Sequence, residues 1–204
     1  MAVSETKRSS YHHGDLPNAL VAAAVGLARQ GGPEAVVLRE AARKVGVSAT
    51  AAYRHFAGYG ELLHAIKLRC QDGLAAAMRA EIDALPDRDD PVARLRALAA
   101  GYLRYATTEP GLFATAFCRG DAAEPPFDFA DAPAFQMLSE ALDQLVARGR
   151  MPAERRPMAE MPLWASVHGL AVLTTDGPLG RLSEQQRAAA LDRTTATLLD
   201  GLLG

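Results

Sequence analysis

The stretch from 38 to 56 constrains the fold of this chain more than any other segment. It reads as two short helices joined by a tight turn. Gly46 stands where the first helix would end with a positive φ angle, which glycine adopts without steric cost. Ser48 is a favourable N-cap for the second helix. Because Ala42 and Val45 present little side-chain bulk before the turn, the two helices can cross closely.

The second helix of this pair has an inner and an outer face. Ala52 and Phe56 are expected to point inward. The residues expected to point outward are Thr50, Ala51, Tyr53 and Arg54. This is the layout of a helix-turn-helix unit, whose second helix enters the major groove of DNA by its N-terminal end. An ordinary helical hairpin is the alternative reading of the same pattern.

The flanking segments complete a three-helix unit. Residues 15–29 form an amphipathic pattern, with Asp15 as a possible cap and Pro17 in the first turn. Residues 31–33 end that helix. After the break at 57–60, a new long helix is expected to begin at Glu61.

At this point the chain resembles a known family. The run from Tyr11 to about Arg69 is similar to the N-terminal DNA-binding domain of TetR-family transcriptional regulators. The similarity lies in Gly32 and in the runs 11–16, 38–42, 45–48, 53–56 and 61–63. A second, shorter run, 164–170, resembles the tryptophan–histidine–glycine (WHG) signature of one class of TetR C-terminal domains.

The pattern and the resemblance together give the candidate DNA contacts. Arg39 resembles an Arg that reaches a guanine edge in this family, and a solvated surface Arg is the alternative. Tyr53 and His55 are expected to contact phosphates rather than bases, and a packed, hydrogen-bonded histidine is the alternative for His55. The complete candidate set is Arg39, Lys44, Ser48, Ala49, Thr50, Ala51, Tyr53, Arg54, His55 and Tyr59.

Two positions depart from what the resemblance implies. The family usually places a Lys at the start of the fourth helix, where this chain has Tyr59. A Tyr hydroxyl can bond a phosphate oxygen but brings no charge, so weaker non-specific binding with a smaller salt dependence is expected. Ala51 offers at most an apolar contact, for example to a thymine methyl group.

Charge is unevenly distributed along the chain. The net charge of 204 residues is −2, yet residues 1–70 hold nine Lys and Arg against five Asp and Glu. The remainder holds 13 basic against 19 acidic residues. This polarity suits a protein that presents one end to a polyanion, although chance would also give a modest excess.

The composition excludes several classes of protein. Two cysteines, Cys70 and Cys118, are too few for a disulfide framework or a metal-type pair. No apolar run suits a secretory signal or a membrane span, so a cytoplasmic protein is expected. No nucleophile elbow, phosphate loop or paired-His motif supports the alternative of an all-helical enzyme. We expect no enzymatic activity, no cofactor and no metal site.

The rest of the chain also reads as helices, without a convincing strand. Their expected ranges are 61–85, 92–108, a short helix from 110, 134–148, 157–175 and 183–203. Ser183 and Gln186 are consistent with a capping box. We therefore expect an all-α fold, with a helix-turn-helix DNA-binding domain at 1–58 and an effector-binding and dimerisation domain at 59–204.

The resemblance implies an effector pocket in the C-terminal domain. Trp164 and His168 lie four residues apart and so share one helical face, where they would give an apolar pocket a polar handle. Ordinary core or dimer packing is the alternative reading for each candidate. The candidates are Tyr102, Tyr105, Phe113, Phe117, Met137, Trp164 and His168.

The resemblance also implies that the last two helices pack against a second copy. Burial of their apolar stripes within one chain is the alternative, but a two-fold dimer would double the DNA site. The candidate interface residues are Met161, Val167, Ala171, Leu191, Thr195, Leu198, Leu199 and Leu202.

These expectations converge on a homodimeric repressor, which binds double-stranded, palindromic operator DNA and is released by an unknown small-molecule effector. A DNA-binding regulator without a small-molecule effector is the remaining alternative.

Overall fold

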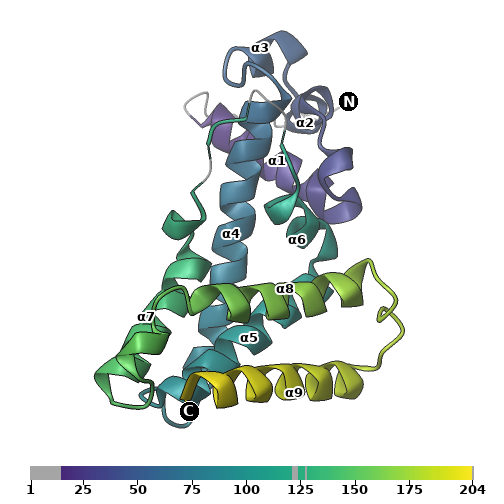
Figure 1. Ribbon diagram of the computed structural model, residues 1–204. Coiled ribbons are helices and arrows are strands. Elements are labelled where there is room, and N and C mark those ends of the chain that lie inside the picture. Colours follow the sequence, from purple (N-terminus) through teal and green to yellow (C-terminus); the bar gives the residue numbers. More distant parts are fainter. Residues whose placement is uncertain (1–14, 121–123, 127, 204) are drawn as a thin grey trace, which may run out of the picture.

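The computed structural model describes residues 15–120, 124–126 and 128–203. Within these ranges the regular structure is entirely helical, so the expected all-α fold is confirmed (Figure 1). Tyr11–Gly14, part of the run that carries the family resemblance, lies outside the described residues. The α-helices are α1 (Leu16–Gly31), α2 (Leu38–Val45), α3 (Ala49–Tyr53), α4 (Tyr59–Asp83), α5 (Pro91–Thr108), α6 (Pro110–Phe117), α7 (Pro133–Ala147), α8 (Glu160–Thr175) and α9 (Glu184–Leu203). The short 3₁₀ helices are η1 (Pro33–Ala35), η2 (Phe129–Asp131) and η3 (Ala153–Arg155).

α4 runs lengthwise through the molecule (Figure 1). Its N-terminal end packs with α1, and its later turns pack with α5, α6 and α7. The buried face carries Leu62, Leu63, Ile66, Leu74 and Met78 at helical spacing, as the sequence predicts. One helix therefore connects the three-helix unit at one end to the larger helical assembly at the other.

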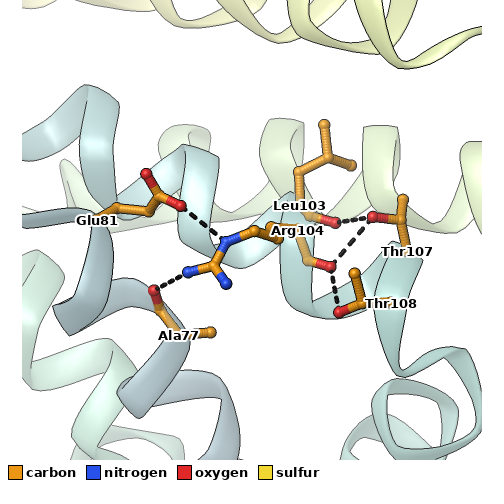
Figure 2. Close-up of polar contacts among 6 residues, drawn as sticks. All are labelled: Ala77, Glu81, Leu103, Arg104, Thr107 and Thr108. Carbon is orange, nitrogen blue, oxygen red and sulfur yellow. Dashed lines mark hydrogen bonds and ion pairs between the residues drawn. The ribbon is translucent and has the colours of Figure 1, made fainter. Parts of the chain in front are cut away.

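The crossing of α4 and α5 is unusually close at Gly101. A Cβ atom there would lie 2.5 Å from the Cα of Met78 and 2.7 Å from the carbonyl oxygen of Ala77. Figure 2 shows the polar clamp beside this crossing. Arg104 of α5 donates to a carboxylate oxygen of Glu81 at 2.7 Å and to the carbonyl of Ala77 at 3.0 Å. The missing side chain at Gly101 and the Arg104 clamp fix the two helices together.

α8 and α9 pack side by side, and both contact α5 (Figure 1). The predicted capping box starts α9: Gln186 N–H donates to Ser183 Oγ, and Ser183 N–H donates to Gln186 Oε1. α8 begins at Glu160 rather than at 157, because the chain turns sharply at Met158, where φ is 59°.

Two smaller expectations also differ from the structure. Asp15 occupies the N-cap of α1 but caps no backbone N–H, since its carboxylate accepts from the Asn18 side chain instead. α4 begins at Tyr59, two residues before Glu61, so the chain break after Phe56 is shorter than predicted.

Candidate functional site

The turn between α2 and α3 is fixed by three local interactions. Gly46 adopts φ 80°, in the left-handed region that favours glycine. The N–H of Val47 then donates to the carbonyl of Ala42 at 3.0 Å and closes the end of α2. Ser48 Oγ accepts from the N–H of Ala51 at 3.1 Å and caps α3, as predicted.

α3 presents an outer face at one end of the molecule, far from α9 (Figure 1). Ala52 and Phe56 are buried and hold the helix against its neighbours. Of the candidate DNA contacts, Ala49 and Ala51 are half-buried. The exposed candidates are Arg39, Lys44, Ser48, Thr50, Tyr53, Arg54, His55 and Tyr59. The structure thus brings the whole candidate set to the surface around one short helix.

The cations of this surface differ in availability. Arg43 is paired with Glu40 through two contacts of 2.6 and 3.0 Å, and this hydrogen bond lowers the pKa of the Glu40 carboxyl. Within the described part of the chain, Arg39, Lys44 and Arg54 form no ion pair. These three side chains are therefore the cations that phosphates or base edges can reach without displacing a carboxylate.

Tyr59 is the first residue of α4. Its hydroxyl donates to the carbonyl of Pro33 at 3.3 Å and ties α4 to η1. A phosphate oxygen accepts hydrogen bonds, so Tyr59 would have to leave Pro33 in order to donate to a phosphate. This geometry gives Tyr59 a structural contact within the three-helix unit.

A second site lies where the later turns of α4 meet α5 to α9. It is a partly open cavity of about 60 Å³, whose wall is mostly apolar. The wall consists of Gln71, Leu74, Met78, Leu95, Leu98, Ala99, Tyr102, Phe117, Phe129, Ala132, Ala134, Phe135, Leu138, Leu163, Trp164, Val167, Thr195 and Leu199. Three of the seven predicted pocket residues, Tyr102, Phe117 and Trp164, belong to this wall.

The other four predicted pocket residues do not line the cavity. His168 and Phe113 form a layer behind it, with ring centroids 5.5 Å apart. Tyr105 faces Gly73 of α4, where a Cβ atom would lie 3.0 Å from its hydroxyl. Met137 is half-buried and packs against the core. All four lie close in sequence to residues of the wall, but they lie on other faces of their helices.

Sequence reasoning did not single out much of the actual wall. Phe135 and Leu138 belong to the apolar stripe predicted for 134–148, and Leu95 and Leu98 to that of 92–108. Their spacing identifies a buried face but not the position of a cavity within the core. No local signal marks Phe129, which reaches the wall from η2.

Two polar side chains of the wall, Tyr102 and Trp164, bond each other, and Tyr102 also bonds His168 behind the wall. The hydroxyl of Tyr102 lies 2.8 Å from Nδ1 of His168 and accepts from Nε1 of Trp164 at 3.3 Å. Since Trp164 can only donate, we assign the Tyr102 hydrogen to His168. Burial raises the pKa of Tyr102 and lowers the pKa of His168, so both groups are uncharged at neutral pH.

The predicted dimer stripe requires a correction. Five of its residues are buried within the chain itself, namely Val167, Ala171, Leu191, Thr195 and Leu199. Met161, Leu198 and Leu202 are half-buried. The reason is that α8 and α9 turn their larger apolar stripes toward α5. The large apolar side chains that α8 leaves exposed are instead Val172 and Leu173, at 39% and 43%.

Neither a membrane span nor a metal cluster is found among the residues that the structure describes. None of the helices there has the length and apolar character needed to cross a bilayer. No group of three or more His, Cys, Asp or Glu side chains there is arranged to hold a metal ion.

Two family models match the chain, one in each half. Residues 20–66 match the model described as "Bacterial regulatory proteins, tetR family". Residues 95–198 match "Tetracyclin repressor-like, C-terminal domain". No curated protein matches the chain.

Solved structures share the fold at low sequence identity. A protein of unknown function from Rhodococcus sp. RHA1 is 24% identical, with a TM-score of 0.77, and the match covers 97% of this chain and all of that one. The regulator PfmR from Thermus thermophilus is 21% identical, with a TM-score of 0.60 and coverage of 89% and 97%. A TetR variant from Acinetobacter baumannii AYE, solved with minocycline, is 22% identical, with a TM-score of 0.59 and coverage of 89% and 93%.

Proposed function

Because the chain belongs to the TetR family of bacterial transcriptional regulators, we propose that it is a homodimeric repressor released from a palindromic operator by a small-molecule effector. Family membership makes it a DNA-binding regulator and not an enzyme. Repression, the dimer and effector release are the steps proposed here. The observation that carries the proposal is one helix, α4, which joins the exposed helix-turn-helix end to an apolar cavity.

We assign the DNA contacts to the outer face around α3. Arg39 reads a base edge, because an unpaired guanidinium can bond guanine through two hydrogen bonds. Lys44 and Arg54 neutralise phosphates, and Ser48 brings the N-terminal N–H groups of α3 toward the backbone. The remaining members of the set, Ala49, Thr50, Ala51, Tyr53, His55 and Tyr59, complete the surface.

We place the domain boundary between residues 58 and 59, where α4 starts. Residues 1–58 then form the DNA-binding domain, and residues 59–204 the effector and dimerisation domain. We also assign the second domain to the WHG class, since Trp164, His168 and Gly169 lie on α8 beside the cavity. Action on bacterial DNA would place the protein in the cytoplasm.

The proposed dimer uses the outer faces of α8 and α9. Val172 and Leu173 are exposed apolar side chains on α8, and small side chains such as Ala165, Ala188 and Ala189 lie exposed on the same two helices. Small residues let helices from two copies approach closely, and a two-fold axis there would place two α3 helices on one face of DNA.

The proposed effector release passes through α6, which packs against α1 and also lines the cavity. Phe117 of α6 lines the cavity. At its other end, a Cβ atom on Gly111 would lie 2.3 Å from the carbonyl oxygen of Ala28 in α1, and Glu109 pairs with Arg29 at 2.8 Å. A ligand that displaces Phe117 would therefore shift α6 and, through these contacts, the position of α1. It can shift the equilibrium only by its difference in affinity for the two conformations.

The test is a fluorescence anisotropy titration against the DNA upstream of the protein's own gene, with competitor DNA present. Arg39→Ala is expected to weaken binding by roughly 1–3 kcal/mol and to relax base preference at one position. Arg43→Ala is the matched control, because Arg43 is already paired with Glu40. Equal losses for the two variants, or none for either, would contradict the assigned surface.

A further inference from the structure

The described part of the cavity wall carries no formal charge. Among the described residues that line it there is no Asp, Glu, Lys, Arg or His. An ion that lies against this wall would lose part of its hydration without gaining a counter-charge, which is unfavourable. The nearest titratable groups, Tyr102 and His168, are neutral and bond each other.

The polar atoms of the wall are mostly satisfied by the protein. Tyr102 bonds both His168 and Trp164, and the Thr195 hydroxyl donates to the carbonyl of Leu191 at 2.9 Å. Gln71 differs from them. Its side chain is buried, and its amide nitrogen reaches the carbonyl of Ala116 only at 3.5 Å, at the outer limit of a hydrogen bond. Because an amide NH₂ has two hydrogens, Gln71, which lines the cavity, has a further hydrogen to donate to a ligand.

Aromatic rings form one side of the wall. The rings of Phe117 and Phe129 are parallel, with centroids 6.2 Å apart, and Trp164 lies 5.2 Å from Phe129. Phe135 meets the same Trp164 ring edge-on at 6.1 Å. Such a wall offers ring faces and edges to a flat partner. A volume of about 60 Å³ exceeds what one water needs, roughly 10–15 Å³, and suits a compact ligand.

We propose that this cavity binds a small, uncharged aromatic compound, which Gln71 orients through a single hydrogen bond. The inference rests on the effector site proposed above and names its ligand class. Carboxylates, ammonium compounds and metal chelates are excluded from the site by the uncharged wall. Specificity comes from ring contacts together with one amide group.

Trp164 makes the proposal directly measurable, because it is the only tryptophan in the chain and it lines the cavity. We would titrate the full-length protein with 4-chlorobenzyl alcohol, 4-chlorobenzoate and 4-chlorobenzylammonium, which share one ring and differ in charge. Trp164 fluorescence and the melting temperature are the two readouts. The alcohol is expected to bind at least about tenfold more tightly than either ion. Equal or tighter binding of an ion, or no response to any probe, would overturn the proposal.

Two variants locate the bound probe. Ala99→Leu fills the cavity from α5 and is expected to abolish the response to the alcohol. Ala100→Leu is the matched control on the next residue, which does not line the cavity. Gln71→Leu is expected to weaken the binding of the alcohol several-fold. The binding of 4-chlorotoluene, which lacks the hydroxyl, is expected to be unaffected. An alcohol response that survives Ala99→Leu, or equal losses for both probes in Gln71→Leu, would contradict the site or the role of Gln71.

The probe titrations and the operator-binding test can fail independently of each other. Tight operator binding without any probe response would reject the ligand class and leave the DNA-binding regulator standing. Probe binding at Trp164 without operator binding would support the ligand class and reject the repressor.

Discussion

At the scale of single residues, His168 couples the stability of the protein to pH. Burial lowers its pKa below the ordinary value of 6.5. In the unfolded chain the imidazole takes up a proton as the pH falls through 6.5, whereas the folded chain resists until the lower folded pKa. The stability that depends on neutral His168 is therefore complete above pH 6.5 and is lost progressively below it. Thermal unfolding from pH 7.5 to about 5 is expected to show this loss in the wild type and less of it in His168→Gln. Melting temperatures that fall equally with pH in the wild type and in His168→Gln would contradict the prediction.

Gly101 is the residue on which the α4–α5 crossing depends. Gly101→Ala places a methyl group 2.5 Å from the Cα of Met78, so the helices must separate. We expect a loss of roughly 1–3 kcal/mol in the free energy of unfolding, measured by urea denaturation. The control is Gly26→Ala in α1, where a Cβ meets nothing within 4 Å. That change is expected to be neutral or to stabilise by about 0.5–1 kcal/mol. The same loss at both positions would mean that the close crossing is not the cause.

At the scale of secondary-structure elements, α3 is only five residues long and depends on its cap. Ser48→Ala removes the hydrogen bond to Ala51 and is expected to cost about 1 kcal/mol of stability, together with DNA affinity. Ser48→Asp keeps a capping oxygen but adds a negative charge beside the proposed phosphate contact. It should therefore retain stability, measured by chemical denaturation, while losing DNA binding, measured by anisotropy. Loss of both properties in Ser48→Asp would show that the charge has no separate effect.

The same elements show what the sequence predicts well. Gly46 and Ser48 mark the helix-turn-helix correctly because a positive φ and an N-cap are properties of a few consecutive residues. Ser183 and Gln186 predict the start of α9 for the same reason. Predictions from such local signals do not depend on the surrounding tertiary structure.

Relations between distant elements were harder to predict. Leu191, Thr195 and Leu199 were predicted to face a second copy, but they are buried within the chain, because periodicity does not say whether α5 or a second copy covers a stripe. The cavity wall posed the same problem, because it depends on how helices far apart in sequence meet. Phe129 and Phe135 join Trp164 only after α7 and α8 have packed.

At the scale of the whole molecule, the exposed face of α8 and α9 determines the proposed assembly. Leu173→Asp places a charge on that face and is expected to convert a dimer to a monomer and to weaken operator binding by at least about tenfold. Light scattering after size exclusion gives the mass. Leu68→Asp is the control, since Leu68 on α4 is equally exposed, at 45% against 43%, but lies away from α8 and α9. A dimer that survives Leu173→Asp would place the interface elsewhere.

The proposed function requires that this chain recognises a specific operator through two copies of α3. A DNase I footprint of the wild-type protein on its own upstream DNA, with excess competitor DNA, tests it most directly. We predict one protected site with two-fold sequence symmetry, whose half-sites are about one helical turn, or 34–36 Å, apart. Protection should fade steeply as salt is raised. Protection spread evenly over the fragment, or a single half-site without symmetry, would contradict the claim.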